Sequence, residues 1–498
     1  MRIMEHNEVD SRATPVDVTT WQPPLYAAQV HAYFAGEPLR LGAGTHLLAH
    51  SALIEDRRGV ERRLTPPVRQ AEPVLAPEHP WEHRRAFYPT ILADPATGRL
   101  RMWYGTLPAF KPGEPIPPYS LLYAESDDGL HWEKPLLDIV HDGDHAHTNI
   151  LYRGANNNCS AVCIVVDPNE TDPARRYKML HKGGTDANGV LGEELAFSPD
   201  GLHWQPYAGN PVMPMRHDCN LNLLYDPQRN VWRAYCRPYA WASGRWLPGD
   251  HPRRRIAIAE SPDLIHWGKV RTAIAPQEGD SNEFNHIAVF PCGNLLVGML
   301  GIFDVPEGDQ HTQLMHIELA VSLDGLQWER LPGRPTFLSP SGVDGTFDRD
   351  SVQACSAAVR DPKSGEMLFY YNGSVCEQQS YSTAIGILRM KPDRFVEQAS
   401  GPEGGWLLTR EFMLEGDALT VNCRAQGAVR VELAEYPGQP IPGFSADECD
   451  PIRGDHLEHR VTWRGGDGDL AELLGRPVYL RFKLEDAGIW AFTMGART

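Results

Sequence analysis

The sequence has little that would mark a membrane, nucleic-acid-binding or secreted protein. Its 498 residues contain no apolar run long enough to span a membrane, and the first residues lack the apolar core of a signal peptide. Lysine and arginine number 47 against 65 aspartates and glutamates, and this net charge of -18 argues against nucleic acid or an anionic membrane as partner. We therefore expect a cytoplasmic protein without such partners. The sequence gives no signal of oligomeric state.

The cysteines also lack the spacing of a metal site. There are nine of them, no C-x-x-C pair occurs, and Cys159 and Cys163 are the closest two. No group of histidines completes a zinc site, and no spacing of Asp and Asn side chains requires another cation. We expect no cofactor and no metal.

Helical periodicity is almost absent, whereas one turn phrase occurs four times. Each copy starts with Ser, continues through a tight turn containing Asp, and ends with Trp. Successive serines are 72, 63 and 61 residues apart, a spacing typical of radially repeated four-stranded sheets. The Asp-Gly turn and the Ser side chain suit a short connection, and the Trp is expected to wedge between neighbouring blades. The four copies run from Ser126 to Trp132, Ser198 to Trp204, Ser261 to Trp267 and Ser322 to Trp328.

Five apolar hairpins accompany these turns and set the predicted fold. They occupy residues 86–104, 161–180, 221–236, 287–300 and 356–371. Beyond residue 398 the blade phrase stops, and short alternating strands follow. The fold class is therefore predicted to be all-β, a five-bladed β-propeller followed by a β-sandwich. The predicted parts are an extended segment packing on the scaffold (1–75), the propeller (76–398) and an accessory sandwich (399–498).

Polar clusters stand just before the hairpins, where loops of a propeller converge on one end of the central channel. Carboxylates on different blades facing one funnel suit acid/base chemistry, and neighbouring Arg, His, Asn and Trp side chains suit sugar binding. The candidate catalytic carboxylates are Glu82, Asp218, Glu283, Asp348 and Asp350. The candidate substrate-binding residues are Trp81, Arg84, Asn158, His217, Asn220, His286 and Arg349.

With its Ser-x-Asp-Gly-x-x-Trp turns, five blades, Trp81-Glu82 before the first blade and a carboxyl-terminal sandwich, the chain resembles the five-bladed propeller glycoside hydrolases of the invertase/levanase and arabinanase superfamily. The resemblance implies three acidic residues in an axial funnel. The Asn-Asp-Pro-Asn segment of the invertases is missing, and Arg360-Asp361-Pro362 and Glu448-Cys449 lie away from the positions that such motifs occupy in that family. The resemblance therefore does not carry fructoside specificity to this chain.

These observations predict a glycoside hydrolase acting on a small saccharide or glycoside in the axial funnel, with Glu283 as general acid and Asp218 as base or nucleophile. Two alternatives stay open. A glycoside phosphorylase on the same fold would bind phosphate through Arg84, Arg85, His217 and His286. A propeller that binds carbohydrate without catalysis would need none of the carboxylates.

Overall fold

The computed structural model describes residues 37–495 except for 95–96, 107–117, 155–156, 186–190, 214–218, 220, 239–253, 278–282, 305–313, 356–357, 362 and 377–380. Every regular element in these ranges is a strand or a 3-10 turn, which confirms the all-β class. The 3-10 turns are η2 (Ser51–Leu53), η3 (Pro80–Glu82), η4 (Pro173–Arg175) and η6 (Ala471–Leu473).

The chain divides into two compact units. The blade unit comprises Thr45–His50 and Arg62–Gln398, and the carboxyl-terminal unit includes Ser51–Glu61 and Ala399–Thr498. The predicted amino-terminal segment thus contributes to both units. Strands β1 (Gly44–Leu47), β3 (Glu61–Leu64) and β26 (Val396–Ser400) lie where the chain passes between the units.

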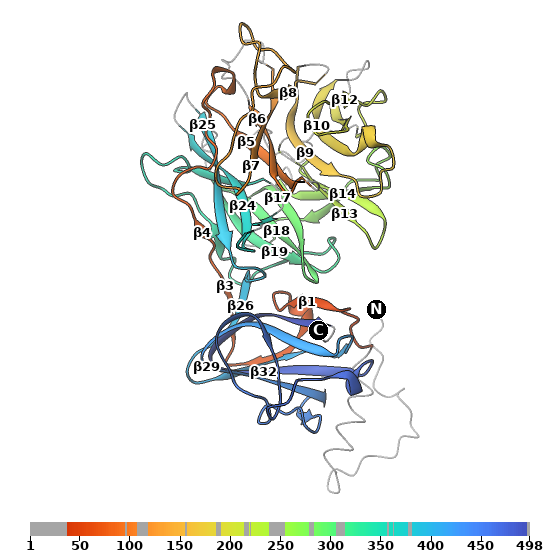
Figure 1. Ribbon diagram of the computed structural model, residues 1–498, viewed down its shortest axis with the longest axis vertical. Coiled ribbons are helices and arrows are strands. Elements are labelled where there is room, and N and C mark those ends of the chain that lie inside the picture. Colours follow the sequence, from red (N-terminus) through yellow and green to blue (C-terminus); the bar gives the residue numbers. More distant parts are fainter. Residues whose placement is uncertain are drawn as a thin grey trace. The chain divides into compact units, whose positions relative to one another are not determined.

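The blade unit contains three four-stranded antiparallel sheets and one larger sheet with two antiparallel halves, which we describe in chain order as blades 1 to 5 (Figure 1). Blades 1 to 3 are β5 (Phe87–Ala93) to β8 (Ile150–Tyr152), β9 (Ser160–Val166) to β12 (Gln205–Pro206), and β13 (Asn222–Asp226) to β16 (Arg271–Ile274). Their intervening strands are β6 (Leu100–Thr106), β7 (Ser120–Ser126), β10 (Tyr177–Thr185), β11 (Leu191–Ser198), β14 (Val231–Cys236) and β15 (Ile256–Ser261). Blade 4 has β17 (Glu283–Cys292), β18 (Leu295–Asp304), β19 (Leu314–Ser322), β20 (Glu329–Arg330) and β21 (Thr336–Leu338). Blade 5 has β22 (Ser351–Ala354), β23 (Val359–Arg360), β24 (Met367–Cys376) and β25 (Tyr381–Met390).

The blades form a closed ring. The first strand of each of blades 1 to 4 contacts the first strand of the next blade, and β24 and β25 of blade 5 contact β5 of blade 1. Blade 5 also takes its outer strand from the beginning of the chain, because β4 (Val68–Arg69) pairs with β25. A single parallel pair, Met315 with Ser351, joins blades 4 and 5 into one hydrogen-bonded sheet.

Each Ser-Asp turn is built by its own side chains, as predicted. In blade 1, Asp128 Oδ1 accepts the N–H groups of Leu130 and His131 at 2.8 and 2.9 Å, and Ser126 Oγ accepts the N–H of Gly129 at 2.9 Å. The Asp bonds recur in the turns of Asp200, Asp263 and Asp324. The Asp oxygen thereby satisfies backbone donors that the tight turn leaves unpaired.

An aromatic donor from the preceding blade caps three of these turns. Tyr370 of blade 5 donates its hydroxyl to the carbonyl of Gly129 in blade 1 at 2.9 Å, and the indole of Trp132 donates to the same oxygen at 3.1 Å. The rings of Trp132 and Tyr370 also meet edge to face at 5.8 Å, which confirms the predicted wedge between blades. The equivalent donors are Trp103 to Gly201 at 2.7 Å and Tyr235 to Gly325 at 2.9 Å.

The turn of blade 3 is the exception. It carries Leu264 where the other turns have glycine, and Leu180 stands in blade 2 where the preceding blades elsewhere supply Trp or Tyr. Both leucines are fully buried in one hydrophobic cluster. An apolar contact therefore replaces the hydrogen bond at this one interface between blades.

The carboxyl-terminal unit is one curled sheet where the sequence predicts a sandwich. Its long strands β29 (Ala418–Tyr436) and β32 (Pro477–Gly495) pair along most of their length. β27 (Gly405–Thr409) lies between β32 and β2 (Ile54–Arg58). The remaining strands are β28 (Phe412–Met413), β30 (Gln439–Pro440) and β31 (Ile452–Arg460).

The sheet curls because β29 and β32 bend together. The rings of Phe482 and Phe492 are 6.1 Å apart, although ten residues of extended strand span about 33 Å. The ladder shifts register between Ala425 and Ala428, and Asp486 has a φ of 43°. The two halves of β32 therefore face each other across the buried aromatic rings.

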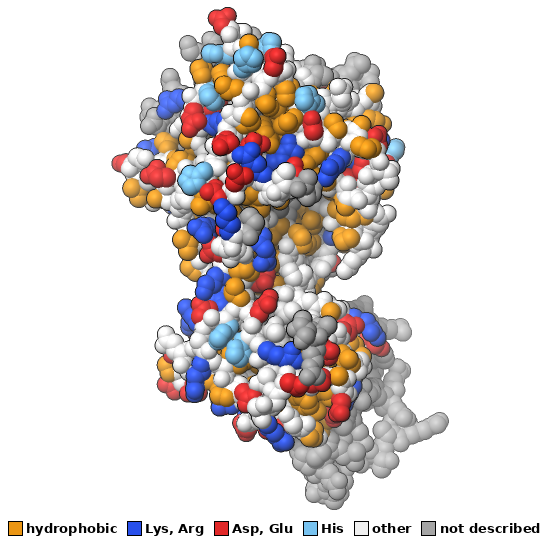
Figure 2. Space-filling model, viewed as in Figure 1, with side chains coloured by type: hydrophobic (Ala, Val, Ile, Leu, Met, Phe, Trp, Pro, Cys, Tyr) orange, Lys and Arg blue, Asp and Glu red, His pale blue; other side chains and the backbone are white. Residues whose placement is uncertain are grey.

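Acidic and basic side chains are interspersed on the visible face of each unit (Figure 2). No large patch of one sign of charge stands out in that view. Among the described elements, no helix is long and apolar enough to cross a membrane.

Replacing Gly129 by Ala should destabilise the blade unit more than the same change at Gly98. Both glycines have a positive φ, 74° and 73°, so the backbone strain is matched. A Cβ at 129 would lie 2.6 Å from the Tyr370 hydroxyl, whereas one at 98 would have nothing within 4 Å. We expect losses of about 1 kcal/mol for G98A and about 2–4 kcal/mol for G129A in urea unfolding. Equal losses would show that the interface between blades tolerates the methyl group.

Replacing Asp128 by Ala should lower stability in a pH-dependent manner. Burial raises the pKa of Asp128, but hydrogen bonds from the His131 ring and from the N–H groups of His131 and Leu130 lower it more, so it lies well below the usual range. A depressed carboxyl pKa stabilises the fold above pH ~4 and loses this contribution as the pH falls further. D128A should cost about 1–3 kcal/mol at pH 7, and the difference from wild type should shrink below pH ~4.

The matched control is Asp127→Ala in the same turn, since the Asp127 side chain is 78 % exposed and pairs with Arg99 at 3.0 Å. It should change stability by less than about 1 kcal/mol. Urea unfolding at pH 7, 5, 4 and 3.5 checks both variants. A D128A deficit that stayed constant down to pH 3.5 would contradict the assignment.

Candidate functional site

The first strands of the blades begin at one end of the ring, which we call the leading end. The register shows what lies beside them there: Ser160 pairs with Lys182, Glu283 with Phe303, and Ser351 with Ser374. Each first strand thus begins where the second strand of its blade ends. Side chains at these positions come from different blades and surround the ring axis.

Three of the predicted site residues, Asp218, His217 and Asn220, lie outside the described residues. The other nine are described. They divide into one group at the start of β17, one residue in blade 2, one pair buried in blade 1, and a group at the seam between blades 5 and 1.

Glu283 opens β17 and is only 7 % exposed. Its Oε2 lies 3.5 Å from Nη1 of Arg254, and the Arg254 guanidinium is 4.8 Å from the centre of the Phe303 ring. Among the described residues, no group donates a hydrogen bond to this Oε2. A buried carboxylate oxygen without a donor costs free energy, which distinguishes Glu283 from the hydrogen-bonded carboxylates of Glu82, Asp348 and Asp350.

His286 lies three residues further along β17 and is 1 % exposed. Its Nδ1 is 3.3 Å from the Asn285 side-chain oxygen, and within the described part of the chain its Nε2 has no hydrogen-bond partner. Burial and then the charge of Arg237 lower the pKa of His286 to about 3. The imidazole is therefore neutral at physiological pH and can exchange a hydrogen bond with an uncharged group.

Blade 3 supports this part of blade 4. Arg237, just after β14, donates through Nε to Cys219 Sγ at 3.5 Å, and that thiol donates to the carbonyl of Asn285 at 3.0 Å. Both Arg237 and Cys219 are buried. We call Cys219, Arg237, Arg254, Glu283 and His286 the Glu283 cluster. It places two guanidiniums, one carboxylate and one neutral imidazole at the leading end.

Blade 2 contributes a second buried polar group at the same end. His181 of β10 faces Glu194 of β11, with Nε2 3.9 Å from Oε2, and its ring meets Tyr152 edge to face at 5.6 Å. Burial is the main cause that lowers the pKa of His181. Asn158, a predicted substrate-binding residue, donates to the carbonyl of Gly183 at 3.3 Å beside this group.

Glu82 is fully buried and serves as an anchor in blade 1. Its carboxylate accepts the N–H groups of Glu78 and His79 at 2.7 and 2.8 Å and the Tyr104 hydroxyl at 2.7 Å. Lys134 Nζ lies 3.0 Å away. Burial raises the pKa of Glu82, but Lys134 and these hydrogen bonds lower it more. A carboxylate with this many partners is suited to holding the chain in place, so we leave Glu82 out of the proposed site.

Trp81 likewise packs into the hydrophobic cluster of blade 1 and is 5 % exposed. Its indole donates to Asn149 Oδ1 at 2.8 Å, and its ring stacks on His79 at 4.6 Å. A ring covered in this way has no open face for a sugar, contrary to the role predicted from the sequence.

Asp348, Asp350 and Arg349 lie in blade 5. Asp348 is buried, accepts the Tyr371 hydroxyl at 2.8 Å and lies 3.3 Å from Arg69 of β4. Asp350 accepts two bonds from Arg349 at 2.9 Å and the N–H of Cys376 at 2.7 Å. The Arg349 bond is the main cause that lowers the Asp350 pKa. These carboxylates are paired within their own blade.

Arg84 lies at the seam between blades 5 and 1. It has a φ of 61°, and its carbonyl accepts the N–H of Thr383 in β25 at 3.2 Å. It lines a hollow of 180 Å³ together with Phe347 and Thr383. The structure thus places Arg84 beside the ring closure and not within the Glu283 cluster.

Sequence reasoning missed Arg254, Arg237, His181 and Glu194. Arg254 precedes the third strand of its blade, Arg237 follows a second strand, and the other two stand inside strands. Among the described residues, no three His, Cys, Asp or Glu side chains are placed to hold a metal ion, and none of the nine cysteines forms a disulfide.

Known proteins resemble this chain in structure, but no family profile matches its sequence and a comparison with curated proteins finds no match. Solved structures that resemble the chain include glycoside hydrolases, as the sequence resemblance predicts. A glycosyl hydrolase from Bacteroides ovatus is 16% identical with a TM-score of 0.46, covering 67% of this chain and 96% of its own.

Two further structures are similar to the same extent. The catalytic domain of the Coprinopsis cinerea GH62 alpha-L-arabinofuranosidase is 12% identical with a TM-score of 0.44, covering 66% of this chain and 97% of its own. An N-acetylgalactosamine deacetylase from F. plautii, solved with blood group B trisaccharide, is 17% identical with a TM-score of 0.45, covering 67% and 96%. The TM-scores of these matches are all below 0.5, so they assign no site residue or substrate to this chain.

Replacing Glu82 by Gln should unfold blade 1 more readily without touching the Glu283 cluster. The change leaves Lys134 buried beside a neutral amide, and breaking a buried ion pair costs about 3–5 kcal/mol. Glu78→Gln is the matched control, because Glu78 is the other carboxylate near Lys134 and its side chain is 70 % exposed. E78Q should cost less than about 1 kcal/mol. Urea unfolding checks both, and equal stabilities would contradict the anchoring role.

Proposed function

We propose that the chain is a glycoside hydrolase that acts at the leading end of the blade ring, with Glu283 in contact with the sugar. The observation that carries the proposal is the buried Glu283 Oε2, which has a cation 3.5 Å away and no hydrogen-bond donor among the described residues. Hydrolysis of a glycosidic bond needs such a carboxylate at a water-poor site.

The neighbour of Glu283 suggests its role. Arg254 Nη1, 3.5 Å from Oε2, is placed as the ion-pair partner of a carboxylate. Within the proposal, Glu283 is therefore the base or nucleophile, and not the general acid predicted from the sequence. It attacks the anomeric carbon or deprotonates the attacking water, while the leaving oxygen takes its proton from a second carboxyl.

The second carboxyl is proposed to come from another blade. Glu193 and Glu194 of β11 are both buried and stand at the leading end, opposite Lys182 and His181. Either one would satisfy the requirement for a protonated group beside the leaving oxygen, about 5 Å or 6.5–9.5 Å from its partner according to stereochemistry. The neutral His286 would accept or donate a hydrogen bond to a sugar hydroxyl.

The phosphorylase alternative is less well supported by this geometry. Two of the residues expected to bind phosphate supply no positive charge beside Glu283: Arg84 lies at the seam between blades 5 and 1, and His286 is neutral because its pKa is lowered to about 3. Turnover of a substrate in phosphate-free buffer distinguishes the two reactions, since a phosphorylase would be inactive there.

Glu283→Gln should lower kcat on a glycoside substrate by at least about 10²-fold, as expected for loss of a catalytic carboxylate. A panel of nitrophenyl glycosides and oligosaccharides identifies the substrate. The control is Glu318→Gln, because Glu318 is in the same blade, is also buried and also pairs with an arginine, Arg330 at 2.6 Å. E318Q should keep kcat within a few-fold of wild type.

The role of Glu283 has its own test. Glu283→Ala leaves space for a small anion, so azide or formate should restore turnover if the missing group is a base or nucleophile. Full activity of E283Q, with wild-type stability, would refute the site. Activity lost equally in E318Q would mean that blade 4 had been disturbed and that Glu283 has no special part.

A further inference from the structure

The carboxyl-terminal unit carries a row of side chains on one face of its sheet. Arg58 of β2 is paired with Trp406 of β27, Trp406 with Lys483 of β32, and Lys483 with Arg430 of β29. Residues directly opposite each other in neighbouring strands share a face, so these four form one line across the sheet. With strands about 4.8 Å apart, the line is about 14 Å long. We call it the Trp406 row.

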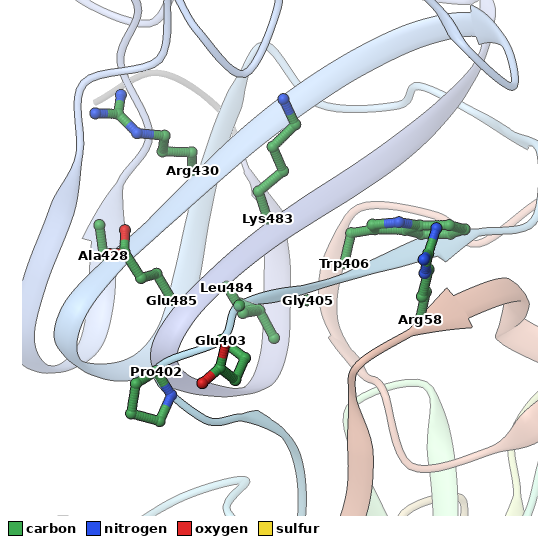
Figure 3. Close-up of a pocket in the computed structure, with 11 residues that line it drawn as sticks. Arg58, Pro402, Glu403, Gly405, Trp406, Ala428, Arg430, Lys483, Leu484 and Glu485 are labelled. Atoms are coloured by element: carbon green, nitrogen blue, oxygen red, sulfur yellow. The ribbon is translucent and has the colours of Figure 1, made fainter.

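The row forms the floor of a hollow. Its volume is 610 Å³, and the side chains of Glu403 and Glu485 stand at its margin with those of the row. Figure 3 shows Lys483 between Arg430 and Trp406, with Arg58 beside the indole. The indole is partly exposed, and the Arg481 guanidinium lies 5.5 Å from its ring centre, a cation–π contact that fixes the ring.

The charges of the Trp406 row are poorly balanced within the unit. Lys483 and Arg430 face each other directly, and like charges in this position destabilise a sheet. Among the described residues, the ion-pair partner of Lys483 is Asp447 at 3.7 Å, whose side chain is 94 % exposed. Arg430 donates to a neutral group, the carbonyl of Cys449, at 2.6 Å. An anion bound between the two cations would relieve this repulsion.

The neighbouring row shows what a balanced arrangement looks like. Two residues along the strands, Asp56 faces Leu408, Leu408 faces Arg481, and Arg481 faces Glu432. There the arginine has its carboxylate partner, with Arg481 Nη1 3.1 Å from Glu432 Oε1. The excess positive charge is therefore confined to the Trp406 row, in which the indole is partly exposed.

We infer that the Trp406 row binds an acidic saccharide, a chain of sugars bearing carboxylates such as uronic acids. The exposed part of the indole suits the C–H face of a sugar ring, and the three cations suit carboxylates, which arginine holds through paired hydrogen bonds. Glu403 and Glu485 are acceptors for sugar hydroxyls. The inference does not depend on the reaction proposed for the blade unit.

Calorimetric titration of the full chain with tetragalacturonate tests this site. We expect binding at one site, weakened as salt rises from 50 to 300 mM. Lys483→Gln and Arg430→Gln should each weaken it about tenfold, the loss expected for one charge-assisted hydrogen bond. Trp406→Ala should weaken it similarly, and Trp406→Phe should restore most of it. The fully methyl-esterified tetramer, which has the same rings without charge, should bind at least about tenfold more weakly.

Arg57→Gln is the matched control. Arg57 is exposed, is adjacent to Arg58 on β2, and points to the opposite face of the strand, so its loss changes the net charge equally but leaves the row intact. Thermal unfolding of every variant shows whether the fold is retained.

Several results would overturn the inference. Equal weakening by R57Q and K483Q would indicate non-specific charge attraction. Unchanged affinity in W406A, or displacement of tetragalacturonate by millimolar inorganic phosphate, would indicate a simple anion site. Absence of binding at 5 mM by both tetragalacturonate and a chondroitin sulfate tetrasaccharide would remove the proposal altogether.

Discussion

The ring of blades depends on a hydrogen bond that three of the blades, 1, 3 and 5, give to the blade that follows. Trp103, Tyr235 and Tyr370 donate across the blade boundary to the carbonyls of Gly201, Gly325 and Gly129. The donors are large and buried, so each bond comes with substantial apolar contact, and an unmade bond would leave a buried polar group unsatisfied. The acceptor is a backbone carbonyl in a turn that Ser and Asp side chains hold in shape. A substitution that distorts the turn therefore also moves the acceptor and weakens the contact between the two blades. The candidate site at the leading end inherits its geometry from this constraint.

Much of this fold can be predicted from the sequence, because its signals are local. The Ser-Asp turns, the apolar hairpins and the change of pattern after residue 398 are short-range features that neighbouring residues specify. Two features could not be predicted. The pairing of β4 with β25 joins residues more than three hundred positions apart. β4 is only two residues long, so neither its length nor its composition predicts a strand. The curl of the carboxyl-terminal sheet depends on paired register shifts around Ala425 and Asp486, which alternation of apolar residues does not reveal.

The candidate site was predictable only in part, for a related reason. Residue type and position before a first strand pointed to Glu283 and His286, and the structure brings both into one cluster. The same criterion also selected Glu82 and Trp81, because a sequence does not show that Lys134 and Tyr104 surround the first, or that Asn149 and His79 cover the second. It passed over Arg254 and Arg237, which come from other strand ends and reach Glu283 and His286 only after the blades assemble.

The outer strand of blade 5 has a consequence for how the protein is made. β4 leaves the ribosome early but pairs with Leu388 and Arg389, which are synthesised more than three hundred residues later. Until then β4 has no strand to pair with, and the first blade lacks the Tyr370 hydroxyl that closes its turn. Because folding with such non-local contacts is slow, nascent chains expose strand edges for much of translation. The closed ring thus removes strand edges that the growing chain leaves open until its last blade is made.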